Sequence, residues 1–497
     1  MTTMTVITSG GYYVPGITFT GSVAGATSGT LTGAVTNGTY TATFSDGEVR
    51  QVTITGGTAC AWSGALSTLS GSITTAQITP PNGIVAGSCS DSAYTWVAPA
   101  DFYKSSSSTD SRNTLWGTTG QPSVKNLFAG SLVVLAAYFG MSSHNQPTLN
   151  QATDWGVTAQ TVRTHDYTGG DSTWRARWSR IEPTAPSGGQ GIADYTQHTY
   201  NFALLDEFVT FHHDLRGRDV IHTLFATPNW ASARPTDVGA YSGGPNNCDN
   251  GSCAEPASMN DWIAYCTACA TRYKGRVKYY EIWNEPNITG SGHQFFSGTQ
   301  TVLAQMVRIA NQTITAIDPS ALIISPPVTN LSTGASQSGN TYFTGMMAAS
   351  DGASGTMANW VNIIGAHLYP VDYTHLATVA TDIMVNIRAS MATAGVSGLP
   401  LWNTEYGILS PNFSTLAQAA RINAIWRMLV LPLANATPCA RTVFYALDDG
   451  VSGFTGQDAT WWNFFVNLLT GATITAINVL WDGRVAVSLA SGSNYIW

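Results

Sequence analysis

Charged residues are scarce in this chain of 497 residues, which carries 29 acidic and 21 basic side chains and a net charge of -8. Nucleic acid is disfavoured as a partner, because binding to phosphates requires a dense lysine and arginine surface. Long blocks of like charge are also missing. Aromatic residues are frequent instead, with 16 Trp, 20 Tyr and 17 Phe. This composition is typical of extracellular proteins and of proteins that face carbohydrate.

Long apolar runs are missing too. The first residues, MTTMTVITSGGYYVPG, have no basic segment followed by an apolar one, so no signal peptide is expected. The most apolar stretch, SLVVLAAYFG at 131–140, is well short of the roughly 20 residues that span a bilayer. We therefore expect no insertion into a membrane.

Cysteine is sparse, with seven residues and no spacing typical of a zinc site. Cys248 and Cys253 lie in the turn-rich segment GGPNNCDNGSCAEP, where we predict a small disulfide, with free thiols as the alternative. Cys266 and Cys269 share the inner face of a predicted helix, so their C-x-x-C spacing indicates core packing rather than a redox pair. The remaining cysteines are isolated in the sequence: Cys60, Cys89 and Cys439.

The character of the sequence changes twice along the chain. Residues 1–78 are predicted to form a small all-β module, because the alternating segment TYTATFSDGEVRQVTI (39–54) indicates a β-hairpin. Residues 79–130, which contain TPPNG and KSSSSTDSRN, are predicted to be an irregular linker. Residues 466–497 alternate again and are predicted to add β-strands packed on the domain before them.

Residues 131–465 alternate between short apolar strands and helical patterns. Strand-like segments are VVLAAYFGMS, TAQTVRTHD, DVIHTLFATPNW, VKYYEIWNE, ALIISPPV, VNIIGAHLYP, LPLWNTEYG and RTVFYALDD. Apolar stripes at helical spacing occur over 201–215 and 301–317. Eight strand and helix units with strands buried on both faces predict an α/β fold, a (β/α)8 TIM barrel. The alternative, a doubly wound open sheet, is disfavoured because no Gly-rich phosphate loop follows a strand.

Two glutamates occupy similar places at predicted strand ends. Glu285 in WNEP ends the fourth strand, and Glu405 in WNTEYG ends the seventh. Strand ends of this kind form the catalytic mouth of a (β/α)8 barrel. Two carboxylates facing across a pocket suit glycosidic cleavage, because one protonates the leaving oxygen and the other meets the developing oxocarbenium ion. The alternative is that both are solvated polar residues.

These motifs resemble those of the clan A retaining glycoside hydrolases. NEP and TEYG look like the acid/base and nucleophile motifs of that clan. The segment that begins RWSRIEP and continues through YNFALLDEFVTFHHDLRGRDVIHTLFATPNWAS is similar to glycoside hydrolase family 39 and its relatives that degrade bacterial biofilm exopolysaccharide. The resemblance covers about 133–449. It implies that Glu285 is the general acid/base, that Glu405 is the nucleophile and that Asn284 bonds the sugar 2-hydroxyl.

Further polar residues lie at strand ends and are assigned supporting roles. His367 and Tyr369 are two residues apart, so they point the same way, and the clan commonly has such a residue bonding the nucleophile. Arg163 ends the second strand, where an arginine near Glu405 would keep that carboxylate ionised. Apolar neighbours of Glu285 are expected to raise its pKa. Structural hydrogen bonding is the alternative role for these residues.

Trp230 and Tyr445 end the third and eighth strands and are predicted to stack on sugar faces, with core packing as the alternative. Four spare carboxylates have no matching partner motif: Glu182, Asp166, Asp448 and Asp449. No cofactor and no metal are expected, because the mechanism with two carboxylates needs neither. The predicted partner is a polysaccharide.

The β-rich segment in front of the barrel is similar in style to small modules of phage tail and head-fibre proteins. Family 39 enzymes usually carry a β-sandwich after the barrel, so this arrangement departs from the family. The resemblance implies a retaining endo-β-glycosidase that acts on bacterial exopolysaccharide or capsule as a virion-borne depolymerase. Its expected location is extracellular or virion-associated, and a virion appendage would be a homo-oligomer, most often a trimer. The alternatives are a secreted β-xylosidase or endoglucanase-like enzyme and a non-catalytic carbohydrate-binding virion protein.

Overall fold

The computed structural model describes most of the chain after residue 124 and short segments before it. The described residues are 3–8, 13–18, 28–31, 38–43, 49–56, 59–62, 75–79, 125–144, 156–168, 176–240, 242, 249–290, 293–332, 339–409, 412–448, 453–479 and 484–496. They belong to two compact units. The first contains Met1–Leu132 and Thr473–Trp497, and the second is Val133–Ala472.

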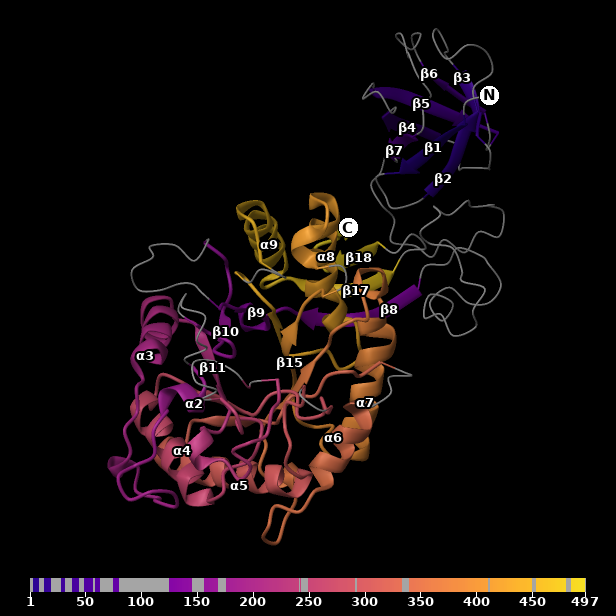
Figure 1. The fold of residues 1–497 in the computed structure, drawn as a ribbon. Helices are drawn as coiled ribbons and strands as arrows, with labels where there is room; N and C mark the ends of the chain where they lie inside the picture. Colours follow the sequence, from indigo (N-terminus) through magenta and orange to yellow (C-terminus); the bar gives the residue numbers. More distant parts are fainter. Residues whose placement is uncertain are drawn as a thin grey trace. The chain divides into compact units, whose positions relative to one another are not determined.

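Short strands form a small closed barrel in the amino-terminal part of the first unit (Figure 1). They are β1 (Thr3–Thr8), β2 (Tyr13–Thr18), β3 (Ser28–Leu31), β4 (Gly38–Thr43), β5 (Val49–Thr55), β6 (Ala59–Trp62) and β7 (Thr75–Thr79). Their order is β1-β2-β3-β6-β5-β4-β7, and β7 pairs in parallel with β1. β4 and β5 pair antiparallel from Gly38 with Ile54 to Thr43 with Val49. The predicted hairpin is therefore confirmed.

A second sheet of the first unit joins segments that are far apart in the sequence. Its order is β19-β18-β17-β8, with β8 at Lys125–Val133, β17 at Thr473–Val479, β18 at Val485–Leu489 and β19 at Asn494–Ile496. The tail thus forms strands from Thr473 onward, as its alternation predicted, whereas residues 466–469 belong to a helix and correct the predicted boundary. The prediction of an irregular segment over 79–130 is wrong at residues 125–130, which belong to β8. A strand can form there because distant residues supply its hydrogen-bond partners. Residues 80–124 lie outside the described part.

The second unit is a (β/α)8 barrel, as predicted. Its described strands are β9 (Phe139–Ser142), β10 (Thr161–Arg163), β11 (Asp219–Leu224), β12 (Tyr279–Ile282), β13 (Leu322–Ile324), β14 (Ile364–His367), β15 (Leu401–Tyr406) and β16 (Arg441–Phe444). Neighbouring strands pair in parallel in the order β13-β12-β11-β10-β9-β16-β15-β14. Two isolated parallel bridges, Ile324 with Ile363 and Val328 with Ala366, close the ring between β13 and β14.

Helices alternate with these strands and form the outer layer (Figure 1). They are α2 (Trp178–Ile181), α3 (Ala203–Val209), α4 (Met259–Tyr273), α5 (Gln300–Ile317), α6 (Gly339–Ala348), α7 (Met384–Thr393), α8 (Gln418–Val430) and α9 (Gly456–Leu469). A π-helical stretch, Thr210–Leu215, continues α3, so both helices predicted from apolar stripes are confirmed. In the described part of the chain, no helix has the length and apolar character needed to cross a membrane.

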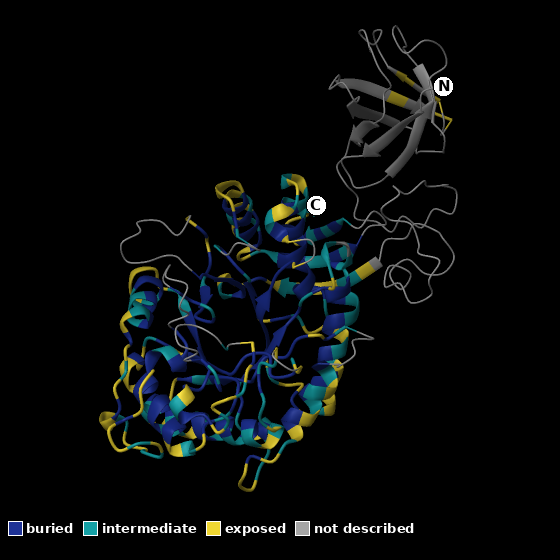
Figure 2. Ribbon diagram, viewed as in Figure 1, coloured by how far each residue is buried: buried dark blue, intermediate teal, exposed yellow. Residues whose placement is uncertain are grey.

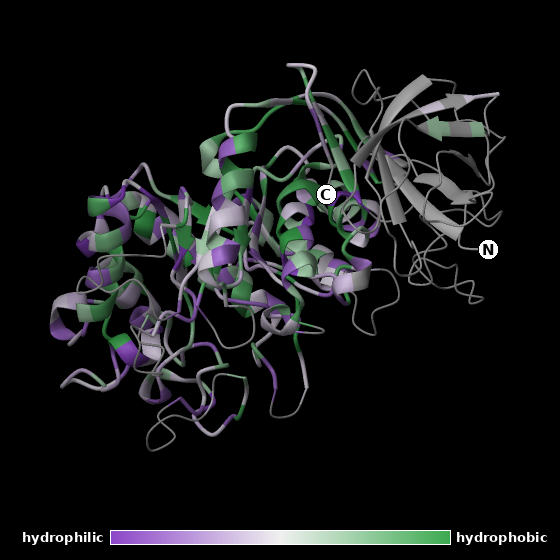
Figure 3. Ribbon diagram, turned by 90° about the horizontal axis from the view of Figure 1, so that it is seen from above, coloured by the Kyte–Doolittle hydropathy of each residue, from purple (hydrophilic) through white to green (hydrophobic). Residues whose placement is uncertain are grey.

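The α5 helix shows how the sequence sets these elements. Thr299 precedes it and accepts a hydrogen bond from the backbone N–H of Val302, which satisfies one of the free donors at the helix start. The helix buries one stripe of side chains: Leu303, Ala304, Met306, Val307, Ile309, Ala310 and Ile314. The helices in Figure 3 carry both hydrophobic and hydrophilic stretches, as amphipathic elements do.

Figure 2 shows that the strands of the barrel are mostly buried, and buried side chains pack against one another inside it. One buried cluster contains Ile221, Tyr279, Ile324, Ile363, Trp402 and Val443. Near the amino ends of the strands, the Arg441 guanidinium lies 4.3 Å from the Trp402 ring centroid and 4.7 Å from that of Tyr279. It also donates to the Thr161 hydroxyl at 2.6 Å. Because this packing fills the amino-terminal end, a ligand is expected at the carboxyl ends of the strands.

The cysteines of the second unit are buried thiols. Cys266 and Cys269 lie on the buried side of α4, as predicted for core packing. Cys253 is also a buried free thiol, and its sulfur packs so closely against Gly239 that a side chain there would clash. The predicted disulfide is therefore wrong at Cys253, because the loop turns this thiol inward. Its predicted partner, Cys248, lies outside the described residues.

Candidate active site

Four barrel strands carry ionisable side chains to one end of the barrel. Arg163 is the last residue of β10, His367 is the last of β14, and Glu405 is next to last in β15. Glu285 follows the end of β12 by three residues. All four are buried. Parallel strands bring their carboxyl ends together, so Arg163 and Glu405 make contact although 242 positions separate them.

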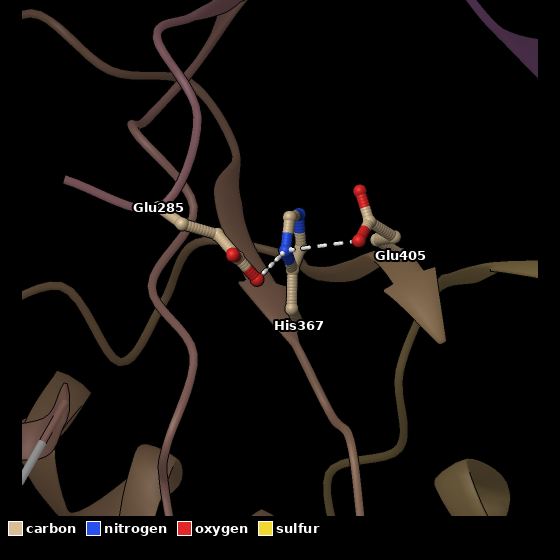
Figure 4. A group of neighbouring side chains, drawn as sticks. All are labelled: Glu285, His367 and Glu405. Carbon is tan, nitrogen blue, oxygen red and sulfur yellow. Dashed lines mark hydrogen bonds and ion pairs between the residues drawn. The ribbon is translucent and has the colours of Figure 1, made fainter. Parts of the chain in front are cut away.

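His367 stands between the two glutamates (Figure 4). Its Nδ1 lies 2.7 Å from Oε1 of Glu285 and 3.9 Å from Oε1 of Glu405. One oxygen of each carboxyl and a ring nitrogen of His367 all lie within 4.8 Å of one another. Burial lowers the pKa of His367 to about 4, so the ring is neutral near pH 7. The sequence prediction that His367 faces this end of the barrel is therefore correct, although its short contact is to Glu285.

Glu285 lies on a turn with unusual backbone geometry. Trp283 and Glu285 have φ of 64° and 41°, the left-handed region that side-chain-bearing residues seldom adopt. Asn287 holds the turn, because its side chain donates to the Thr329 carbonyl and accepts from the Thr329 N–H. Burial raises the pKa of Glu285 to about 7, although Arg163 opposes the rise. The carboxyl is therefore suited to donate a proton near neutral pH.

Two described side chains donate hydrogen bonds directly to Glu405. Arg163 Nη1 donates to its Oε2 at 2.6 Å, and the Tyr369 hydroxyl donates to its Oε1 at 2.9 Å. Burial raises the pKa of the Glu405 carboxyl above its ordinary value, and His367 and Arg163 oppose that rise. The predicted contact with Arg163 is therefore present, but its lowering effect on the pKa of Glu405 is smaller than the raising effect of burial. Donors to a carboxylate favour its ionised form, so these two hydrogen bonds also oppose the effect of burial on Glu405.

Arg163 connects three strands. Its Nε donates to Glu281 Oε2 at 2.8 Å, and its Nη2 donates to Asn284 Oδ1 at 2.7 Å. Asn284, predicted to bond substrate, thus lies in the network and accepts from Arg163. Sequence reasoning missed Glu281. The available signal was a carboxylate inside the apolar strand YYEI and an arginine inside TVR, because buried charges need partners.

Tyr445 joins the site through Asp166. Its hydroxyl donates to Asp166 Oδ2 at 3.2 Å, and Arg177 donates to the other oxygen at 2.9 Å. His165 Nδ1 lies 3.2 Å from Asp166 Oδ2 and 3.8 Å from Glu405 Oε2. Asp166, a spare carboxylate in the sequence, is therefore close to the predicted nucleophile. The structure thus brings Tyr445 to the edge of the glutamate pair.

Trp230 belongs to a different cluster. Its indole N–H donates to the Glu182 carbonyl at 2.9 Å. The Glu182 carboxyl accepts from Trp178 at 2.8 Å and lies 2.5 Å from His198 Nδ1. The polar contacts of Trp230 are thus separate from those of Glu285 and Glu405. Its predicted stacking on sugar stays a prediction.

The two remaining spare carboxylates follow β16. Asp448 accepts from the backbone N–H of His144, two residues after β9, at 2.7 Å. It is half-buried. Asp449 lies outside the described residues. Asp448 therefore joins the loops after the first and last barrel strands.

The spacing of Glu285, His367 and Glu405 also resembles a metal site. Two carboxylates and an imidazole within 4.8 Å could hold a divalent cation. Arg163 fits such a site poorly, since its guanidinium already places a positive charge 2.6 Å from Glu405. The donor set therefore suits a pair of acids held by an arginine better than a metal centre.

No family model and no curated protein matches this chain. Among solved structures, it is similar to a family 39 glycoside hydrolase from Bacteroides cellulosilyticus, at 12% identity over 99% of this chain and 88% of that one, with a TM-score of 0.47. A monomeric beta-xylosidase from Caulobacter crescentus shares 15% identity over 72% and 74% of the two chains, with a TM-score of 0.47. A glucosidase from Croceicoccus marinus shares 14% identity over 73% and 74%, with the same score.

Proposed function

We propose that this chain is a retaining glycoside hydrolase in which Glu285 is the general acid/base and Glu405 is the nucleophile. The observation that supports this most directly is the approach of the two carboxyl groups, which have oxygens within 4.8 Å of each other. Retaining enzymes hold these groups about 5 to 5.5 Å apart, whereas inverting enzymes need about 6.5 to 9.5 Å to admit a water. The short gap favours direct attack by Glu405.

The first chemical step would form a glycosyl-enzyme. A Glu405 oxygen attacks the anomeric carbon, the bond to the glycosidic oxygen breaks, and Glu285 gives its proton to that oxygen. Arg163 and Tyr369 hold the Glu405 carboxylate in place for the attack. Neutral His367, with Nδ1 2.7 Å from Glu285, donates a hydrogen bond to the Glu285 carboxylate once the proton has left.

The second step would release the sugar. Glu285, now ionised, takes a proton from a water that attacks the same anomeric carbon, and the bond to Glu405 breaks. Both groups then return to their starting protonation states. Because each step inverts the anomeric centre once, the product keeps the configuration of the substrate.

We infer that the substrate is a bacterial exopolysaccharide or capsule that the enzyme cleaves within the chain as a virion-borne depolymerase. Support comes from the low charge and high aromatic content of the sequence and from the resemblances of the segment after Arg177 and of the amino-terminal β-module. An extracellular or virion-associated location and a trimeric state belong to the same proposal.

A substrate panel tests this assignment. We expect the full chain to release oligosaccharides from bacterial exopolysaccharides and nothing from xylan or cellulose, with turnover unchanged by EDTA. Release only from xylan or cellulose would instead support a β-xylosidase or endoglucanase-like enzyme. Binding to polysaccharide without any release of sugar would support a non-catalytic virion protein.

The pH profile should show the protonated state of Glu285. Its pKa of about 7 means that kcat/KM should fall as pH rises through that value, because only the protonated carboxyl can act as the acid in the first step. Rates on a natural linkage, measured from about pH 4 to about pH 9, check this. A nitrophenyl glycoside needs no acid assistance, so its alkaline limb should be much weaker. An equally steep limb with both substrates would contradict the assignment.

A further inference from the structure

Glu281 has an unusual environment for a buried carboxylate. It lies within β12 and is fully buried. Three donor groups surround its Oε2: Arg163 Nε at 2.8 Å, Arg163 Nη2 at 2.7 Å and the Thr223 hydroxyl at 3.0 Å. Its other oxygen, Oε1, is buried and has no hydrogen-bond partner among the described residues. A buried charge with an unsatisfied oxygen is costly to keep, which favours a role beyond stabilising the fold.

The Glu281 contacts decide which part of Arg163 reaches Glu405. A guanidinium prefers to hold a carboxylate with two parallel N–H groups, one on each oxygen. Here the Nε and Nη2 edge of Arg163 faces Glu281, so Nη1 is the group that donates to Glu405, at 2.6 Å. Two parallel bonds to Glu405 would stabilise its negative charge further and would make it a weaker nucleophile.

We propose that Glu281 is a positioning residue that anchors Arg163 by one edge, so that Glu405 receives a single guanidinium N–H and keeps a lone pair available for attack. This inference rests on the proposed function, in which Glu405 is the nucleophile. Thr223 supports the arrangement from β11 by donating to the same Glu281 oxygen. The device therefore spans β10, β11, β12 and β15.

Other titratable and charged groups around Glu405 also influence the charge of its carboxyl group. They come from β10 and its loop, from β12 and the turn after it, and from β14 and its loop: Arg163, His165, Asp166, Glu281, Glu285, His367 and Tyr369. Of these, Glu281 competes most directly with Glu405 for Arg163, because its Oε2 accepts from Nε and lies 2.7 Å from Nη2, which also donates to Asn284.

Glu281→Gln tests the inference. The amide keeps the shape of the side chain but removes its charge, so the Arg163 charge acts more fully on Glu405 and lowers its pKa. We expect the acid limb of kcat/KM to move down by about one pH unit, since one neighbouring charge typically shifts a carboxyl pKa by this amount or more. The plateau should fall by about tenfold, because a less basic carboxylate attacks more slowly. The measurement uses a nitrophenyl glycoside. Because this substrate needs no acid assistance from Glu285, the acid limb of its pH profile reports the protonation of Glu405.

Asp458→Asn is the matched control. Asp458 is also a fully buried carboxylate, paired with Arg421 between α8 and α9. Its replacement should lower the thermal unfolding temperature, as Glu281→Gln should through the loss of a buried ion pair, but it should leave the acid limb in place. A shift of the limb in both variants would show a general effect of stability and would overturn the inference.

Thr223→Val supplies a second variant that preserves side-chain shape. It removes one donor from Glu281, so Glu281 attracts Arg163 more strongly and the acid limb should move slightly upward, opposite to Glu281→Gln. An unchanged limb in Glu281→Gln, with an active wild-type enzyme, would overturn the inference while leaving the proposed function standing. If Glu281→Gln does not fold, an unchanged or lowered limb in Thr223→Val overturns it. If the wild type hydrolyses no glycoside, the proposed function fails, and the inference fails with it.

Discussion

Glu405→Ala should abolish hydrolysis, with kcat lower by roughly 10⁴-fold or more, because the first step has no nucleophile without this carboxylate. The loss should be about equal for natural linkages and for nitrophenyl glycosides, since both must form the same glycosyl-enzyme. Arg163 and Tyr369, which donate to Glu405, remain in place, so the expected defect is chemical. Steady-state rates and thermal unfolding of the same preparation check the prediction.

Glu182→Gln is a suitable control for the substitutions of both glutamates. Glu182 is fully buried, lies 2.5 Å from His198 Nδ1 and has a pKa that burial raises to about 7. Glu182 therefore resembles Glu285 in its burial, its histidine contact and its raised pKa. Unlike Glu285, it does not belong to the proposed catalytic pair. Its replacement should retain most of the wild-type turnover. Equal inactivation of Glu182→Gln and Glu405→Ala would contradict the assignment of the pair.

Glu285→Ala should lower kcat/KM for natural linkages by roughly 10²- to 10⁴-fold, the usual contribution of a general acid. Nitrophenyl glycosides should lose much less in the first step, because nitrophenolate leaves without a proton. The second step also loses its base, so the glycosyl-enzyme should accumulate and appear as a burst followed by slow turnover. Pre-steady-state measurement of nitrophenol release checks this.

Azide separates the two glutamates. Azide needs no general base, so it can attack the glycosyl-enzyme of Glu285→Ala. This attack should restore turnover and release a β-glycosyl azide as the product. Glu405→Ala forms no glycosyl-enzyme and should yield no such product. A β-glycosyl azide from Glu405→Ala, or unimpaired hydrolysis by either variant, would reject the assigned roles. The azide product is identified by its anomeric coupling in proton NMR spectra.

Much of the barrel could be predicted from local sequence. Each strand is a short apolar run followed by a helical pattern, and both signals depend on residues within a few positions of each other. The location of Glu285 and Glu405 followed from the same reasoning, because a strand end in a (β/α)8 barrel faces the mouth. The α4 cysteines were also predictable from helical spacing.

The failures share a physical cause. β8 needs hydrogen bonds from β17, hundreds of residues later in the chain, so no local pattern revealed it. The predicted disulfide required both thiols to face each other, but the fold turns Cys253 inward. Glu281 was overlooked because its partner, Arg163, is 118 positions away. In each case the outcome depended on contacts between distant segments.

The sequence by itself determined the order of strands and helices and placed two glutamates at the ends of the fourth and seventh barrel strands. Only the tertiary structure decided that His367 stands between them and that Arg163 is shared by Glu281 and Glu405. It also decided that burial raises the pKa of Glu405 despite the nearby arginine. Periodicity is a local property of the chain, whereas desolvation and charge contacts arise only when distant strands enclose the same small volume.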